Sequence, residues 1–200
     1  MYEKKFNIDN IYSIFNLILR MLILLNLVHN ISDKNYYNIL VAIAGFVLTF
    51  IPSLIFKIIK IEEDKSLSFS ILFFIFISLY LGTLHNFYRF SWWDTMLHTI
   101  SGIIIGLFAI VLLKKRDSNS RLEKFDKVFI IIFILSFTAL CGVLWEIYEF
   151  TADTLFNLDM QGAKFTGVTD TMVDLIADLI GSIISCVYYY FTYGKKTFKS

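Results

Sequence analysis

The residues best suited to chemistry in this sequence are acidic side chains and a histidine that lie within or beside three long apolar runs. An ionisable side chain in hydrocarbon costs several kcal/mol unless it has a partner, and by default it marks a functional site. The candidates are Asp94, His98, Glu146, Glu149, Asp174 and Asp178.

Their spacing places them on three helical faces. Residues three, four, seven or eight positions apart share one face of a helix. The resulting stripes are Asp94 and His98; Glu146, Glu149 and Asp153; and Asp170, Asp174 and Asp178. Because lipid cannot solvate charged groups, we expect the stripes to face one another or a water-filled pocket.

Such a cluster could bind a divalent metal ion. Carboxylate oxygens suit Mg²⁺, Ca²⁺ or Mn²⁺, and a histidine admits Zn²⁺ or Fe. A bound metal could activate water for hydrolysis. Without a metal, one crowded carboxylate could hold a proton and act as a general acid or a proton carrier. All six residues are therefore candidate ligands, and Glu146 and Asp178 are also candidate catalytic groups, although none of the spacings is an established ligand motif.

Structural explanations compete with a functional site at several of these positions. Asp170 precedes an apolar run, a pattern typical of a helix N-cap, and Asp94 is open to the same interpretation. Arg20, near the middle of the first apolar run, needs a counter-ion. Asp178 or Glu146 could supply it as a structural buried pair.

The polar segment 157–169 separates the last two apolar runs. It is long enough to cover the mouth of a pocket as a lid. Asp153 and Asp159 are interpreted as solvated loop residues.

The elements that must position these residues are predicted to be membrane-spanning helices. Hydrophobic residues make up 57% of the chain and charged residues 18%, with a mean hydropathy of +0.67, which excludes a soluble domain. A helix needs about 20 apolar residues to cross a bilayer. Such runs occupy roughly residues 11–28, 39–56, 67–84, 95–113, 128–150 and 171–191. The prediction is an all-α transmembrane bundle of six helices in a single integral membrane domain, residues 1–200, with a kink at Pro52 in the second span.

The orientation follows from the basic residues. With six spans, both termini and the second and fourth loops share one side, and 14 of the 18 basic residues lie there. That side is expected to be cytoplasmic, because basic residues accumulate in cytoplasmic loops. The acidic stripes then fall in the outer half of the membrane.

Small residues mark where helices can approach closely. Gly102 and Gly106 form a Gly-x-x-x-Gly pair beside Ser101, and Gly142 and Gly181 lie on the last two spans. Small residues let helix backbones approach in a membrane. The three polar helices are thus expected to pack together.

The second half of the chain resembles the YjdF-like family of bacterial inner-membrane proteins. The residues that carry the resemblance are Trp93-Asp94-Thr95-Met96-Leu97-His98, Trp145-Glu146-Ile147-Tyr148-Glu149-Phe150, Met160-Gln161 and Asp170-Thr171-Met172 followed by Asp174 and Asp178. The resemblance implies that these polar positions matter and that the protein lies in a bacterial plasma membrane. A fainter likeness is to VanZ-like membrane proteins. Neither family supplies a reaction.

Three functions remain open at this stage. The first is a metal-dependent enzyme that acts on a lipid or envelope substrate at the outer leaflet. The second is a small cation- or proton-coupled transporter or ion-binding protein, and the third is a non-catalytic assembly or sensing partner. The bilayer is the expected partner in each case. Nucleic acid is excluded, because no basic stripe or Cys/His finger is present.

Overall fold

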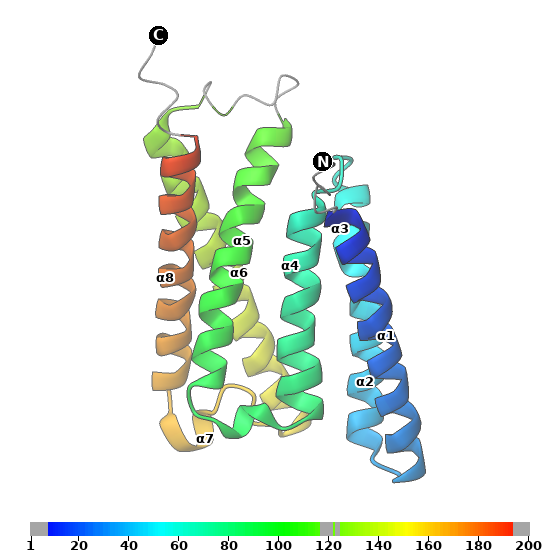
Figure 1. Cartoon of the computed structure of the whole chain (residues 1–200). Helices are drawn as coiled ribbons and strands as arrows, with labels where there is room; N and C mark the ends of the chain where they lie inside the picture. Colours follow the sequence, from blue (N-terminus) through cyan, green and yellow to red (C-terminus); the bar gives the residue numbers. More distant parts are fainter. Residues whose placement is uncertain (1–7, 117–121, 123–124, 194–200) are drawn as a thin grey trace. The chain divides into compact units, whose positions relative to one another are not determined.

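The computed structural model describes residues 8–116, 122 and 125–193, and no strand occurs in that part of the chain (Figure 1). Five of the described helices are long and apolar enough to cross a membrane, and a bent pair of helices makes a sixth candidate span. The predicted all-α membrane fold is therefore confirmed. The chain forms two compact units, which divide between Trp93 and Asp94.

The first unit contains the first three predicted spans. Its elements are α1 (Ile8–Ser32), α2 (Tyr36–Leu48), α3 (Ile51–Ile58), α4 (Lys65–Ile75), the π-helix η1 (Phe76–Leu84) and the 3₁₀ turn η2 (Phe87–Arg89). α4 and η1 together form one continuous apolar stretch. The unit is held by a core of Tyr12, Leu19, Ile23, Ala42, Leu72 and Ile75.

The second predicted span is divided between α2 and α3, which meet at an angle of 44°. Pro52 is at the start of α3. Proline lacks an amide hydrogen and disfavours helical backbone at the residue before it, so a helix tends to end there. The predicted kink at Pro52 is confirmed.

Arg20 finds its partners at this bend, within the first unit. Its Nε donates to the hydroxyl of Thr49 over 2.9 Å, and its guanidinium carbon lies 3.9 Å from the centre of the Phe50 ring. The hydrogen bond and the cation–π contact both stabilise the half-buried guanidinium. Pairing of Arg20 with Asp178 or Glu146 stays a prediction.

Glu63 links α3 and α4 of the first unit through its carboxylate. Oε1 accepts hydrogen bonds from Ser53 of α3 (3.0 Å) and Ser68 of α4 (2.7 Å), and Oε2 accepts one from Lys65 (2.7 Å). Burial raises the pKa of the Glu63 carboxyl, but the hydrogen bonds outweigh it, so the pKa lies below its ordinary value.

The second unit contains the polar stripes. Its elements are α5 (Trp93–Arg116), α6 (Lys127–Phe156), the short α7 (Ala163–Thr166) and α8 (Thr169–Thr192). One end of the unit is an apolar core of Ala109, Ile110, Leu113, Leu122, Ile130, Ile134 and Tyr189. The start of α5, the end of α6 and the start of α8 lie together at the other end, next to α7 (Figure 1).

Glycines bring α5 and α8 into backbone contact. A Cβ at Gly102 would overlap the carbonyl of Asp178, and a Cβ at Gly181 would overlap the carbonyl of Thr99. No side chain can be accommodated at either point, because the opposing atoms are backbone. The close approach expected from the small residues is confirmed.

Candidate metal centre

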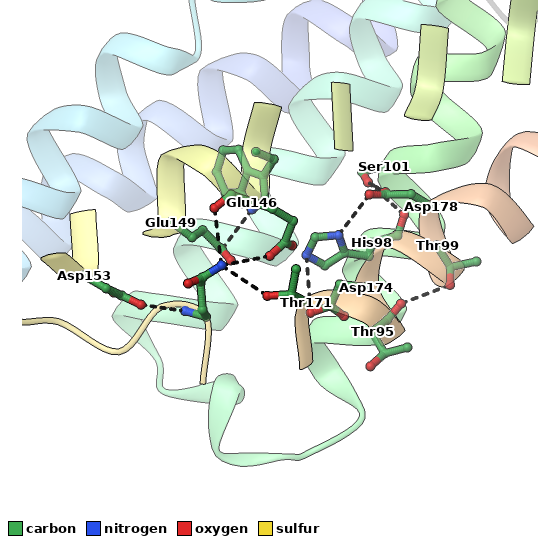
Figure 2. Close-up of polar contacts among 12 residues, drawn as sticks. Thr95, His98, Thr99, Ser101, Glu146, Glu149, Asp153, Thr171, Asp174 and Asp178 are labelled. Carbon is green, nitrogen blue, oxygen red and sulfur yellow. Dashed lines mark hydrogen bonds and ion pairs between the residues drawn. The ribbon is translucent and has the colours of Figure 1, made fainter. Parts of the chain in front are cut away.

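His98 is at the middle of the polar end of the second unit. Its Nδ1 lies 3.2 Å from Oδ2 of Asp178, and its Nε2 lies 4.0 Å from Oδ2 of Asp174 (Figure 2). All three side chains are buried, with 6%, 2% and 3% of His98, Asp178 and Asp174 exposed. Each ring nitrogen of His98, which belongs to α5, thus faces a carboxylate of α8.

Asp94 completes a group with His98 and Asp174. One ligand atom of each residue lies within 4.8 Å of the other two. Asp94 is half-buried in the first turn of α5, one helical turn before His98. One imidazole nitrogen and two carboxylates form a ligand set that suits Mn²⁺, Fe²⁺ or Zn²⁺.

Asp178 is held from two helices. Its Oδ1 accepts a hydrogen bond from the hydroxyl of Ser101 over 2.7 Å, on the helix that also carries His98. On α6, a Cβ at Gly142 would lie only 2.5 Å from Oδ2 of Asp178. Gly142 therefore makes room for the carboxylate, and the position of Asp178 is fixed by packing as well as by hydrogen bonds.

Glu146 and Glu149 of α6 line the other side of the cluster, and both are buried. Oε2 of Glu146 lies 3.4 Å from the amide nitrogen of Gln161, whereas its Oε1 has no hydrogen-bond partner in the described part of the chain. Oε1 of Glu149 accepts a hydrogen bond from the indole of Trp145 over 2.9 Å. In Figure 2 the side chain of Glu146 lies next to the imidazole ring of His98.

The segment between α6 and α8 packs against this end of the unit. The side-chain amide of Gln161 donates to the Thr171 hydroxyl over 3.1 Å and also reaches Glu146, so it connects α8 to α6. Asp153 accepts hydrogen bonds from the backbone amides of Met160 (2.7 Å) and Gln161 (3.0 Å). The interpretation of Asp153 as a solvated loop residue is wrong, because it belongs to α6 and anchors the loop.

The predicted N-cap at Asp170 is also wrong. α8 begins at Thr169, and its N-cap is Val168, which makes no side-chain hydrogen bond. Asp170 is in the first turn and packs against Gly162, where a Cβ would lie 2.5 Å from its carboxylate. Gly162 also has a left-handed backbone with φ of 62°, which glycine adopts without strain.

Three polar contacts at this end escaped the sequence analysis. Ser101 was considered only for helix packing, and Gln161 only as part of the lid and of the family motif. The three contacts are the hydrogen bonds from Ser101 to Asp178, from Trp145 to Glu149 and from Gln161 to Thr171. The first joins two helices, the second joins neighbouring turns of α6, and the third joins the loop to α8. For Ser101 the usable signal was its spacing of three from His98 on one face of the helix.

A family model described as "Predicted membrane protein (DUF2238)" matches residues 14–195. The chain belongs to this family. A Thermotoga maritima protein, named "Uncharacterized protein", is 34% identical over 108 residues, which are 54% of this chain and 53% of that protein. The chain thus spans about half the length of that relative. No solved structure matches the chain significantly.

Proposed function

We propose that this DUF2238 protein is a metal-dependent membrane hydrolase that acts on a lipid or a lipid-linked envelope substrate. The contact of Asp178 with Nδ1 of His98 is the observation that carries the proposal. A carboxylate accepts hydrogen bonds, so Nδ1 bears a proton, and in the neutral imidazole Nε2 then keeps its lone pair for a metal ion. Metal-binding histidines nearly always donate the other ring N–H to a carboxylate or a carbonyl, which fixes the ring.

In this proposal His98, Asp94 and Asp174 are the ligands of one divalent ion. Asp178 and Ser101 position the imidazole without touching the metal. Three protein ligands leave coordination positions open for water and substrate, as in catalytic zinc sites. A divalent ion held by these residues would lower the pKa of a bound water toward neutrality and would so supply a nucleophile for hydrolysis.

The charge asymmetry of the loops supports a site in the outer half of a bacterial plasma membrane, with both termini in the cytoplasm. Lys114, Lys115 and Lys127 belong to the ends of α5 and α6 opposite the acidic cluster. Among the 14 basic residues assigned to the cytoplasmic side, those outside the described part of the chain are Lys4, Lys5, Arg121, Lys124, Lys195, Lys196 and Lys199. An outward-facing site would meet substrates in the outer leaflet.

A cation transporter is the second candidate, because the same ligands could hold an ion in transit. Six spans are few for alternating access, and the sequence has no inverted repeat of the kind that many transporters contain. The Asp178 carboxylate that orients His98 also favours a resident ion over a passing one, since it makes the site more rigid. We therefore place the enzyme first.

The test uses the full chain purified in mild detergent. Elemental analysis is expected to find Mn, Fe or Zn bound in stoichiometric amount, and Asp174→Asn is expected to lose it. The protein is then incubated with bacterial lipid extract in heavy-oxygen water, and mass spectrometry reads the lipids. Hydrolysis places heavy oxygen in a product only when the metal is present.

Asp159→Asn is the matched control, because Asp159 is a loop carboxylate that accepts a hydrogen bond from the Lys164 amide and is not part of the cluster. It is expected to retain both metal and labelling. Folded protein that never binds metal would overturn the proposal. Metal binding without labelling, together with Mn²⁺ flux in proteoliposomes, would favour the transporter.

A further inference from the structure

We propose that the centre holds two divalent cations, with Glu146 and Glu149 as ligands of the second. This inference rests on the proposed metal site, and it extends that site from α5 and α8 to α6. It also gives Glu146 the role of a ligand in place of the catalytic role considered from the sequence.

Charge is the first reason. Five carboxylates meet at this end of the second unit, those of Asp94, Glu146, Glu149, Asp174 and Asp178, and the last four are each less than 7% exposed. Within the described residues, the side chain that pairs with these carboxylates is His98, which is neutral in the proposed first site. One divalent ion would offset two of the five negative charges, and a second would offset two more. Unbalanced like charges repel strongly where water is excluded.

The second reason is an oxygen without a partner. Glu146 is 5% exposed, and its Oε1 makes no hydrogen bond with any described residue. A buried carboxylate oxygen without a donor is costly, and such atoms are rare in folded proteins. A cation against Oε1 would satisfy it, because a metal ion replaces the missing donor.

Position is the third reason. Glu146 is close enough to interact electrostatically with both Asp94 and Asp174, and Glu149 is close enough to interact with Asp94 and Glu146. Asp94, which interacts with residues of both groups of ligands, would be the carboxylate shared by the two ions in this proposal. Two-metal sites hold ions about 3.5–4 Å apart, with the ions stabilising the attacking and the leaving oxygen.

Trp145 supports the second ion in the way that Asp178 supports the first. Its indole N–H donates to Oε1 of Glu149 over 2.9 Å, which orients the carboxylate. Such outer contacts hold a ligand in place and tune its affinity for the metal. Trp145 is thus a positioning residue in this proposal.

Mn²⁺ is the probe for the test, because two ions that share a carboxylate give an exchange-coupled paramagnetic resonance signal. The full chain in detergent is titrated with Mn²⁺, and two ions per chain with a coupled signal are expected. Glu149→Gln is expected to bind one ion and to lose the coupling. Trp145→Phe keeps the ligand and is expected to weaken the second ion about 10-fold while leaving the first unchanged.

The outcomes separate this inference from the proposed function. One uncoupled ion in the wild type, lost in Asp174→Asn, overturns the second site and leaves the first. No bound Mn²⁺ overturns both. Two ions in Glu149→Gln would show that α6 does not supply the ligands, and would also overturn the inference.

Discussion

The backbone carbonyl of Asp178 on α8 packs directly against Gly102 on α5, at a point where no side-chain atom can fit. The side chain of the same aspartate contacts His98, one helical turn earlier on α5. The approach of the two backbones therefore sets the distance between the imidazole and the carboxylate. Helix packing and the candidate site depend on the same pair of residues.

Gly102→Ala is expected to destabilise the protein. The new Cβ meets a backbone oxygen, which cannot move aside as a side chain would, and overpacking of this kind costs about 1–3 kcal/mol. Gly45→Ala in α2 is the control, because its Cβ would lie 3.6 Å from a methyl group of Leu79, an ordinary contact. Alanine also favours a helix over glycine by about 1 kcal/mol. Thermal unfolding in detergent should show a lower midpoint for Gly102→Ala alone.

Asp178→Asn is expected to weaken metal binding 10- to 100-fold, the usual cost of removing a carboxylate that orients a histidine ligand. The amide keeps the size of the side chain but no longer fixes the proton on Nδ1 of His98. Nitrogen NMR of labelled histidine would detect the change of tautomer, which a loss of packing alone would not produce. Unchanged affinity together with an unchanged tautomer would contradict the role given to Asp178.

Sequence patterns predicted the spans and the polar stripes because both depend on composition and helical period. The spacing of Asp94 and His98, and of Asp174 and Asp178, was sufficient to place each pair on one face. Whether the polar stripes of two helices meet depends on how far one helix is shifted along the other. Here that shift is set by the contacts of Gly102 and Gly181 with the backbone of the facing helix, and the sequence alone does not show which residues these glycines contact. The sequence therefore placed Asp178 among the clustered residues but did not show that it contacts Nδ1 of His98.

The predictions that failed concern helix ends. Asp170 resembles an N-cap in sequence, but α8 begins one residue earlier and its aspartate packs against Gly162. Asp153 resembles a loop residue, but α6 continues to Phe156 and the carboxylate turns back to the loop. Helix ends depend on local hydrogen bonds that hydropathy does not register.

Asp153→Ala is expected to loosen the loop that follows α6. The substitution removes the acceptor of two backbone amides, those of Met160 and Gln161, and a hydrogen bond to a charged group contributes about 1.5–3 kcal/mol. Hydrogen exchange followed by mass spectrometry should show faster exchange across the loop. Thr154→Ala is the control, since its hydroxyl bonds only to the carbonyl of Phe150 in its own helix. Equal exchange in the two variants would contradict the anchoring role.

Glu63 is expected to make the stability of the first unit depend on pH in the acidic range. Its pKa in the folded protein lies below the ordinary value of 4.5, so the carboxylate stabilises the fold at any pH above that value. As the pH falls from the ordinary value through the lowered one, the carboxylate takes up a proton and the stabilisation is lost. The difference in unfolding midpoint between wild type and Glu63→Gln should be constant near neutral pH and should shrink below a pH of about 4.5. Ser68→Ala removes one of the donors that lower the pKa of Glu63. The stability of this variant should therefore fall less steeply than that of the wild type as the pH is lowered. A difference that widens as the pH falls would contradict the sign of the shift.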